Sequence, residues 1–402
     1  MFESIYLGLT GLASFSRNLT VIGNNVSNLN TPGFKASQLA FSDLPYSNRF
    51  SDRNDGAGAQ FQLGSGVGTG GTRLLFTQGN LRDTGNPTDL AIEGNGFFVT
   101  RDADGRTVYT RAGDFQFDEQ GFLVSRTGAR VAAFAGGSLT DLNIAAIRSN
   151  PPRATSTVRL IDNLSSGDTT HDVAINVFDV AGGNHALTLR FVNNGAAVPR
   201  SWLLEVRDAT NALVSAGEVR FAGDGSPEPG FNSHSFTFTP PGGVPASTLT
   251  LDFGAPGTFS GATNFSAGAD STLRLGSQDG FAAGALTETT FDADGVLVAQ
   301  YSNGQSRRHQ RLALAFFEFP QNLEAVGDAG FENRSGEPVQ LGGAREGAFG
   351  NIAAGVVESA NVDLAQQFSD LIISQRGYQA SSQVVSTANE MIQQLFDMKS
   401  RR

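Results

Sequence analysis

Cysteine is absent from the 402 residues of the sequence. The chain therefore forms no disulfide and offers no thiolate metal ligand and no thiol nucleophile. Positive charge is also scarce: 28 Lys and Arg residues stand against 39 Asp and Glu residues, so the formal net charge is −11. A nucleic-acid-binding protein would need a basic face, so this charge argues against nucleic acid as a partner.

Two targeting features are missing as well. No apolar run reaches the roughly 18 residues that a membrane-spanning helix requires, so we predict no membrane insertion. The N-terminus does not match a secretory signal peptide, because its first basic residue is Arg17 and because Gly8, Thr10 and Gly11 interrupt the apolar residues before it. The lack of Cys fits an exported chain that must not cross-link in transit, but it also fits a protein that happens to lack Cys.

Glycine and phenylalanine are abundant: the chain has 49 Gly, and 31 Phe against 5 Tyr, while charged residues make up only 17%. This composition is typical of a turn-rich protein with an aromatic core, and it predicts much β-structure. The length predicts two or three domains.

Residues 1–30 carry apolar side chains at every seventh position, in two rows three residues apart. This a/d pattern predicts a helix with an apolar seam. Thr31-Pro32-Gly33 is predicted to end the helix, because the residue before Pro avoids the α region. The two rows are Ile5, Leu12, Leu19 and Val26, and Phe15, Ile22 and Leu29.

The C-terminal segment, from about 361 to 399, repeats the heptad pattern, and Asn361 is its predicted N-cap. Both terminal segments are close to neutral, which favours helices that pack against each other and against copies of the chain. The alternative is that each helix packs on its own domain. The predicted seam consists of Leu364, Leu371, Tyr378, Val385 and Ile392, flanked by Phe368, Ala388, Leu395 and Phe396.

From about Thr72 the apolar periodicity changes to two, with Asp-Gly and Asn-Gly turns between short runs, which predicts β-hairpins. Residues 150–279 are richer in Ser, Thr and Pro and read as a separate module. The sequence DADG occurs at both 102–105 and 292–295, which suggests that the segments on either side of this module form one domain.

The predicted fold class is therefore a multidomain α+β protein, with terminal coiled-coil-like α-helices and two mainly-β domains, the outer inserted in the inner. We assign residues 1–71 and 356–402 to a terminal helical domain with linkers. Residues 72–147 and 280–355 form the predicted inner β domain, and residues 148–279 the predicted inserted outer β domain. The Gly-rich segments 56–71 and 342–355 are predicted to be flexible linkers.

Motifs that could carry chemistry are weak. GVGTGG at 66–71 satisfies G-x-G-x-x-G, but a strand follows it where a dinucleotide site needs a helix. The DADG turns lack the distal Glu of a calcium loop. Asp102 and Asp104 could serve acid–base chemistry, but turn acids are far commoner than catalytic ones. We predict no catalytic residue, no cofactor and no metal site, since no i, i+4 pair exists among His171, His185, His234 and His309.

Three stretches resemble the axial proteins of the bacterial flagellum, namely the rod, hook and junction proteins. They are IGNNVSNLNTPGFK (22–35), GNPTDLAIEGNGFFV (85–99) and the segment 358–395, which begins ESANVDL. The length and the segment DGFAAGALTETTFDADGVLVAQYSNGQ favour the hook proteins, since rod proteins of this family lack a large inserted module. The residues that match the N-terminal signature are Asn24, Asn25, Asn28, Thr31, Gly33, Phe34 and Lys35.

This resemblance implies a structural subunit that self-assembles into the flagellar hook, the flexible curved tube, or universal joint, that transmits torque from motor and rod to filament. In the family, terminal helices line the inner wall, and the Asn-rich stretch would end the inner helix and send the chain outward. The implied location is extracellular, in the flagellar hook and basal body, without a cleaved signal peptide. The implied partners are copies of the chain, the distal rod protein, the hook cap, the hook–filament junction protein and the flagellar type III export apparatus.

Two alternatives stay open at this point. Within the family, the chain could be a distal rod or hook–filament junction protein. From another class, it could be an exported β-rich enzyme that acts on cell-wall glycan, which would require a cleft with two converging acids. A surface adhesin is disfavoured because it would carry a cleavable signal.

Overall fold

The computed structural model describes residues 2–50, 60–268 and 270–400. The chain divides into two compact units. The first comprises Met1–Ala145, Thr289–Val298 and Arg308–Arg402, and the second comprises Ala146–Glu288 and Ala299–Arg307. The second unit is therefore inserted in the first, and the predicted fold class, terminal helices with one β-rich part inserted in another, is confirmed.

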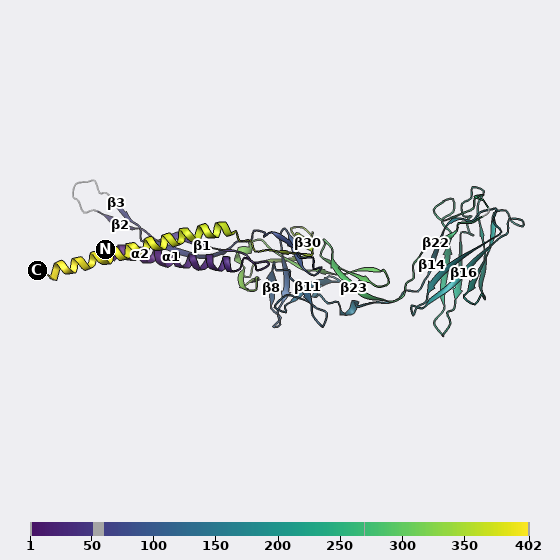
Figure 1. The fold of residues 1–402 in the computed structure, drawn as a ribbon, viewed down its shortest axis with the longest axis horizontal. Helices are drawn as coiled ribbons and strands as arrows, with labels where there is room; N and C mark the ends of the chain where they lie inside the picture. The colour runs from purple at the N-terminus through teal and green to yellow at the C-terminus, as the bar shows by residue number, and fades with distance from the viewer. Residues whose placement is uncertain (1, 51–59, 269, 401–402) are drawn as a thin grey trace. The chain divides into compact units, whose positions relative to one another are not determined.

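Two long helices, α1 (Phe2–Ser27) and α2 (Leu364–Ser400), lie side by side and antiparallel in the first unit (Figure 1). Neither helix is long and apolar enough, over its described residues, to cross a membrane. Helix α1 ends at Ser27, before the predicted stop at Thr31-Pro32-Gly33. At the end of the helix the backbone N–H of Asn28 is shared between the carbonyls of Asn24 and Asn25 (both 3.2 Å), and its side-chain amide also donates to Asn24 O (2.9 Å).

The N-cap of α2 is Asp363, so the prediction of Asn361 was wrong. The Asp363 carboxylate accepts hydrogen bonds from the backbone N–H groups of Ala365 (2.8 Å) and Gln366 (3.2 Å). An anionic side chain at this position satisfies the free amides of the first turn and complements the helix dipole.

The β-structure of the first unit is built from short strands around one main sheet. Within it, neighbouring strands follow the order β25-β11-β7-β8-β28-β27, and β26 joins β7 to β29. The strands in the N-terminal part are β1 (Ser37–Asp43), β2 (Ser47–Phe50), β3 (Gln60–Leu63), β4 (Val67–Leu74), β5 (Leu81–Asp83), β6 (Leu90–Glu93), β7 (Phe97–Arg101), β8 (Thr107–Thr110), β9 (Gln116–Phe117), β10 (Leu123–Val124), β11 (Arg130–Ala135) and β12 (Ser138–Asp141). Those after the insertion are β26 (Leu314–Phe317), β27 (Glu324–Gly327), β28 (Gly330–Glu332), β29 (Val339–Gly342), β30 (Asn351–Ala354) and β31 (Val356–Glu358).

Three further strands have residues in both units: β23 (Gly284–Phe291), β24 (Val296–Tyr301) and β25 (Ser306–Leu312). Short 3-10 helices occupy Ala145–Ile147 and Pro320–Asn322. Both DADG segments form hairpin turns, as predicted. Asp102 Oδ1 accepts from the N–H groups of Asp104 and Arg106, and Asp292 makes the equivalent bonds in the second turn.

The two Gly-rich linker predictions were wrong in the described residues. Val67–Leu74, which holds most of GVGTGG, is the strand β4, and it pairs antiparallel with β1. Asn351–Ala354 pairs with β6, and Ala344 is fully buried. Backbone pairing fixes these glycines because a strand partner lies beside them, which composition cannot reveal. Residues 56–59 of the first predicted linker lie outside the described residues.

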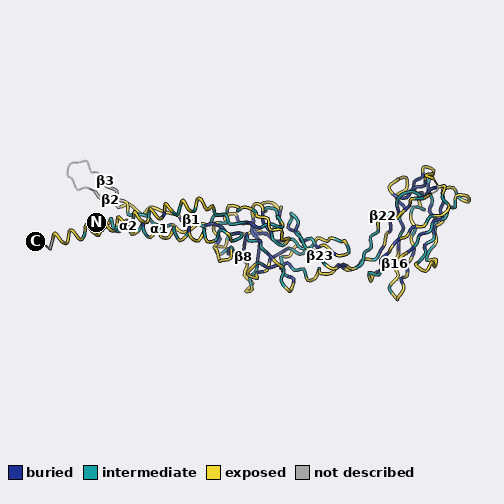
Figure 2. The backbone as a smooth tube through the Cα atoms, in the orientation of Figure 1, coloured by how far each residue is buried: buried dark blue, intermediate teal, exposed yellow. Residues whose placement is uncertain are grey.

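Aromatic rings fill the core of the first unit. Phe97 of β7 lies 6.0 Å from Phe331 of β28, and Tyr109 of β8 lies 4.8 Å from Phe317 of β26, between ring centroids. Figure 2 shows these β-strands as largely buried, whereas much of the outer surface of the helices is exposed. Phe suits these buried positions because, unlike Tyr, it brings no hydroxyl group that needs a hydrogen-bond partner.

The second unit is a β-sandwich whose two sheets share one buried core. One sheet is antiparallel with the order β15-β16-β17-β18, and the other has the order β19-β20-β14-β21 with β22 beside β14. Trp202, Phe191 and Phe253 are fully buried between them. The strands are β13 (Ser149–Asn150), β14 (Thr157–Asn163), β15 (Thr170–Phe178), β16 (Asn184–Asn193), β17 (Ser201–Asp208), β18 (Leu213–Arg220), β19 (Ser233–Phe238), β20 (Ser247–Asp252), β21 (Ala262–Thr263) and β22 (Arg274–Gln278).

Candidate functional site: the helix pair and its buried junction

The contact between α1 and α2 is made largely by small and polar side chains. Asn18 Nδ2 donates to Ser374 Oγ (2.7 Å), and Asn25 Nδ2 donates to Gln367 Oε1 (3.0 Å). Ser374 is buried, so its hydroxyl is satisfied across the pair. Hydrogen bonds between side chains thus fix the register of the two helices, beside their apolar contacts.

Glycine allows the two backbones to approach closely. A Cβ atom at Gly8 would lie 2.5 Å from the Val385 Cγ2 atom, and one at Gly377 would overlap the ring of Phe15. A larger side chain at either position would push the helices apart. Gly8 lies seven residues before Phe15 in the second heptad row, so a glycine at a row position here permits the close approach of the helices.

The predicted seam residues divide into three groups in this structure. Ile22 is buried. Leu29 lies beyond the end of α1, which explains why its row could not continue as a helical seam. The exposed members are Leu364, Phe368, Tyr378 and Leu395. The half-buried members are Ile5, Leu12, Phe15, Leu19, Val26, Leu29, Leu371, Val385 and Ile392.

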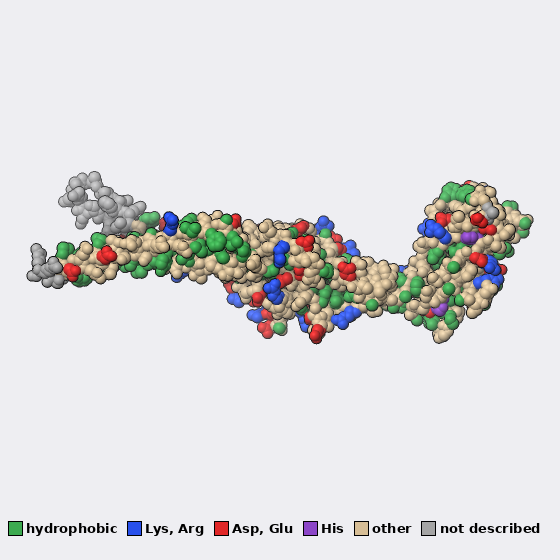
Figure 3. Space-filling model, in the orientation of Figure 1, with side chains coloured by type: hydrophobic (Ala, Val, Ile, Leu, Met, Phe, Trp, Pro, Cys, Tyr) green, Lys and Arg blue, Asp and Glu red, His purple; other side chains and the backbone are tan. Residues whose placement is uncertain are grey.

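Two exposed apolar stripes flank the buried face of α2. At about 100° per residue, Leu364, Phe368 and Ile372 fall on one side of the helix. The other side carries Ile373, which is 62% exposed, followed at helical spacing by Val384, Met391 and Met398. Figure 3 shows hydrophobic side chains gathered over the helical part of the first unit. Exposed apolar surface of this extent marks a protein contact.

Helix α2 also extends beyond the start of α1. Val385 faces Gly8, so α2 continues for about four more turns to Ser400, while α1 has fewer than two turns left to pair with them. Phe396 is 67% exposed and Met398 is 68% exposed. No part of the described chain covers these last turns.

A buried charge cluster lies where the helices meet the β-structure. Glu358, at the end of β31, is fully buried, and its carboxylate accepts from Lys35 Nζ (2.6 Å) and from the backbone N–H of Gly79 (2.8 Å). The Arg111 Nη1 atom lies 3.4 Å from its other oxygen. Three distant segments of the chain, at 35, 111 and 358, thus share one carboxylate.

Backbone carbonyls also accept hydrogen bonds from the two cations of the cluster. They are needed because a single carboxylate cannot satisfy all the donors of Lys35 and Arg111. Lys35 Nζ donates to Thr77 O (2.8 Å), and Arg111 Nη2 donates to Gly94 O (2.7 Å). Burial lowers the pKa of Lys35 from its ordinary value, since desolvation outweighs the attraction of Glu358, and burial lowers the pKa of Arg111 in the same way. Loss of the carboxylate would leave both cations uncompensated.

Other residues of the N-terminal signature fix the exit of the chain from α1. Gly33 adopts φ +68°, its N–H donates to Glu358 O (2.8 Å), and a Cβ there would overlap the backbone of Ala112. Asn25 exchanges two hydrogen bonds with the backbone of Ser37. Asn361, which is not a cap, accepts from the N–H of Ala36 (2.7 Å) and donates to Leu75 O (2.7 Å).

The remaining signature residues have smaller roles. Asn28 donates to Asn24 and accepts from the hydroxyl of Thr31 (3.2 Å), so these three residues form the turn after α1. Phe34 is half-buried, and its carbonyl accepts from the N–H of Asn361. Sequence reasoning missed Arg111 and Glu358 as partners of Lys35. No local sequence signal marks them, because the three residues lie far apart in the chain and meet only in the fold.

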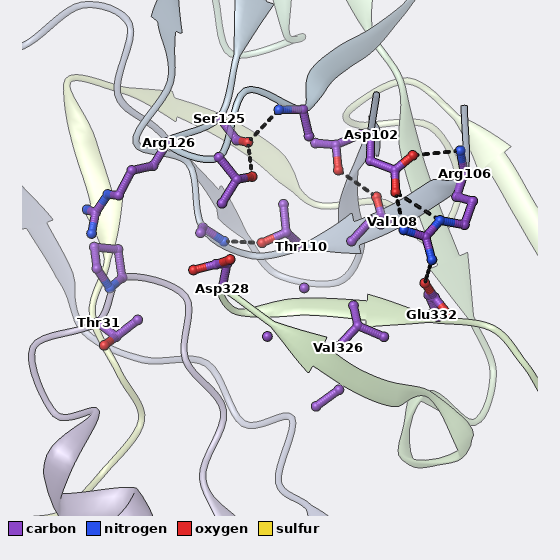
Figure 4. Close-up of a pocket in the computed structure, with 18 of the residues that line it drawn as sticks. Thr31, Asp102, Arg106, Val108, Thr110, Ser125, Arg126, Val326, Asp328 and Glu332 are labelled. Atoms are coloured by element: carbon purple, nitrogen blue, oxygen red, sulfur yellow. Dashed lines mark hydrogen bonds and ion pairs between the residues drawn. The ribbon is translucent and has the colours of Figure 1, made fainter. Parts of the chain in front are cut away.

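A pocket of about 480 Å³ opens beside the helix exit, between Pro32 and the β27–β28 hairpin (Figure 4). Its charged side chains pair with one another: Arg106 lies 2.8 Å from Asp102, and Arg126 lies 2.5 Å from Asp114. The backbone N–H of Arg106, foremost, holds the pKa of Asp102 below its ordinary value. A carboxyl group with a lowered pKa is a poor proton donor near neutral pH, so Asp102 does not suit general acid catalysis.

The sequence matches four family models along its length. They are described as flagella basal body rod protein (residues 5–35), flagellar hook protein FlgE/F/G D1 domain (91–164), flagellar basal body protein FlaE D2 domain (146–329) and flagellar basal body rod FlgEFG protein C-terminal (353–398). The matches therefore cover both helices and both β-rich parts.

Full-length relatives carry the comparison further. The chain is 30% identical to the flagellar hook protein FlgE of Treponema pallidum, with 99% of this chain and 100% of that protein aligned. The chain belongs to the flagellar hook protein FlgE family. FlgE of Borreliella burgdorferi is 29% identical, with 99% of this chain and 100% of that protein aligned. FlgE of Escherichia coli is 28% identical, with 97% of this chain and 98% of that protein aligned.

A solved structure agrees at the level of the fold. The flagellar hook protein FlgE2 of Helicobacter pylori aligns with a TM-score of 0.50 at 14% identity, and it covers 69% of this chain and 100% of its own. As a FlgE family member, the chain is a structural protein of the flagellar hook and not an enzyme, and it forms the hook, an extracellular part of the flagellum. Membership in this family implies polymerisation with copies of itself.

Proposed function

We propose that the two exposed stripes of α2 bind two different neighbouring subunits in the hook polymer. A helical array presents each subunit with neighbours on more than one side, and the stripes lie on opposite sides of the buried face of α2. The observation that supports this proposal is the exposure of Ile372 and Ile373, two adjacent apolar residues that face in different directions.

Burial of each such side chain in a neighbour would contribute roughly 1.5–3 kcal/mol per subunit. The contribution recurs at every subunit, so a small loss at one contact should stop elongation. The predicted seam residues Leu364, Phe368, Tyr378 and Leu395 belong to this surface in our proposal, together with the last turns of α2, which an adjacent subunit would cover.

The buried charge cluster around Glu358 connects the pair of helices α1 and α2 to the β-structure of the first unit. Because the cluster joins the exit of α1, the entry of α2 and β-structure residues, it resists rotation of the helix pair relative to the first unit's sheet. We assign to it the transfer of torsional load, so that the polymer works as a curved tube, with terminal helices on the inner wall, that carries torque from rod to filament.

We also propose specific partners for the hook polymer. The distal rod protein and the hook–filament junction protein would meet the two ends of the polymer, the hook cap would stand at its growing end, and the type III export apparatus would deliver the chain. We also keep the domain division of 1–71 and 356–402, 72–147 and 280–355, and 148–279 as a proposal. It separates the helices from the inner β domain, which together form one compact unit here.

The stripes are tested with Ile372→Asp and Ile373→Asp, each made alone, and with Gln383→Asp as the matched control. Gln383 is an exposed polar residue of the same helix, so Gln383→Asp adds a carboxylate without removing an apolar side chain. The two Ile variants should export and fold but form no hooks by electron microscopy and no polymer in sedimentation, because a buried unpaired carboxylate is costly. Gln383→Asp should assemble. Normal hooks from both Ile variants would refute the proposal.

A further inference from the structure

Three Asn-Gly pairs occur in the sequence, and each lies between two strands. Asn95-Gly96 connects β6 to β7, Asn194-Gly195 connects β16 to β17, and Asn303-Gly304 connects β24 to β25. In such a pair the backbone nitrogen of glycine can attack the side-chain carbonyl of asparagine, and glycine hinders the attack least because it has no Cβ. The local structure then decides which pair reacts.

Hydrogen bonds restrain two of these pairs. The Asn303 side chain donates to Ala282 O (2.8 Å) and accepts from the N–H of Gln305 (3.1 Å), and the N–H of Gly304 donates to Tyr301 O (2.9 Å). At the other pair, the N–H of Gly195 donates to Asn193 Oδ1 (2.8 Å). The nucleophile is engaged in both cases.

At the third pair the two reacting groups lack such hydrogen bonds in the part of the chain that the structure describes, although the Asn95 backbone carbonyl accepts from the N–H of Gly350 (2.9 Å). Among the hydrogen bonds of the described residues, none involves the Asn95 side chain or the N–H of Gly96. Asn95 is exposed in a bend, and Gly96 adopts φ +121°. We propose that Asn95 is a site of spontaneous deamidation, in which water is the only co-reactant.

The reaction balances as follows for this site. The Gly96 nitrogen loses its proton and forms a bond to Asn95 Cγ, the Cγ–Nδ2 bond breaks, and ammonia leaves with that proton, which gives a cyclic succinimide. Water then opens the ring at either carbonyl, so the product is Asp or isoaspartate at position 95. No electron transfer is involved.

The position of this turn gives the modification a structural consequence. Gly94 O accepts from Arg111 Nη2, so the new carboxylate lies one residue from a carbonyl that holds the buried junction. Isoaspartate would also add a backbone methylene to the same turn. Deamidation therefore acts on the support of the Arg111 guanidinium.

Trypsin places the three Asn-Gly pairs in three different peptides, so their deamidation rates can be compared within one protein sample. Cleavage after Arg and Lys places Asn95 in residues 83–101, Asn194 in 191–200 and Asn303 in 275–307. Soluble full-length chain is incubated at 37 °C and mildly alkaline pH, which favours the deprotonated nitrogen, and digests are followed by mass spectrometry. Fragmentation locates the change at Asn95, and Asn95→Gln, which cannot form the five-membered ring, is the negative control.

We expect Asn95 to deamidate at least about fivefold faster than Asn194 and Asn303, the factor that one net hydrogen bond of about 1 kcal/mol gives. In urea-unfolded chain the three rates should converge, because all three pairs are the Asn-Gly dipeptide and no folded structure then distinguishes them. Equal rates in the folded chain would overturn the proposal. A difference that persists in urea would overturn it too, since sequence rather than structure would then be the cause.

Discussion

Glu358→Gln tests the buried junction with almost no change of shape. The glutamine can still accept a hydrogen bond from the N–H of Gly79, but the substitution removes the one carboxylate that pairs with Lys35 and Arg111 among the described residues. Both cations are almost fully buried, so neither can turn to water for compensation. The variant therefore isolates the charge from the packing.

Breaking a buried ion pair by removal of one partner costs roughly 3–5 kcal/mol. Because one hydrogen bond is retained, we expect Glu358→Gln to lie near the lower end of this range, with a loss of about 3 kcal/mol in the free energy of unfolding. Lys35→Met in the Glu358→Gln background should recover part of the loss, because one of the two uncompensated charges disappears. The same Lys35→Met change alone should be milder than Glu358→Gln.

The two units give the assay its internal control. Trp202, the single tryptophan, is buried in the second unit, so its fluorescence reports urea unfolding of that unit. Hydrogen exchange of the paired strands β5 and β31 reports the junction. Glu358→Gln should speed exchange in these strands and leave the Trp202 transition unchanged. A loss of unfolding free energy below about 1 kcal/mol, which is typical of a surface ion pair, would refute the conclusion that the buried charge of Glu358 stabilises the junction.

Four further changes test other parts of the structure. Gly33→Ala should destabilise the first unit by about 1–3 kcal/mol in urea unfolding, because φ is positive and no space exists for a Cβ; Gly23→Ala, in an open helical position, should stabilise it by about 0.5–1 kcal/mol. Deletion of residues 154–280 with a Gly-Gly bridge should leave a folded first unit by circular dichroism, since two backbone hydrogen bonds join the flanking residues. The His185 hydrogen bond, foremost, lowers the pKa of Asp179, so this carboxylate contributes stability above its unfolded pKa of about 3.8 that is lost as the pH falls further. Asp179→Asn should therefore weaken the Trp202 transition at pH 7 and reduce its acid sensitivity.

Much of the architecture followed from the sequence by itself. Heptad rows at both ends predict two long helices because an apolar position every seven residues has no other regular solution over four heptads. The DADG turns predict hairpins because Asp and Gly supply the side-chain acceptor and the backbone freedom that a tight turn needs. The inserted module was visible as a change in turn composition, and the family signatures pointed to the flagellar axial proteins.

Tertiary structure decided which residues perform which role. A heptad row predicts that a helix has an apolar face, but the packing of α1 against α2 decides which face is buried. Ser374 and Gly377 therefore line the contact with α1, while Phe368 remains exposed. Glycine-rich segments read as linkers became strands because a neighbouring backbone supplied the hydrogen bonds. The junction of Lys35, Arg111 and Glu358 could not be predicted, because charges far apart in the sequence pair only when the fold removes them together from water.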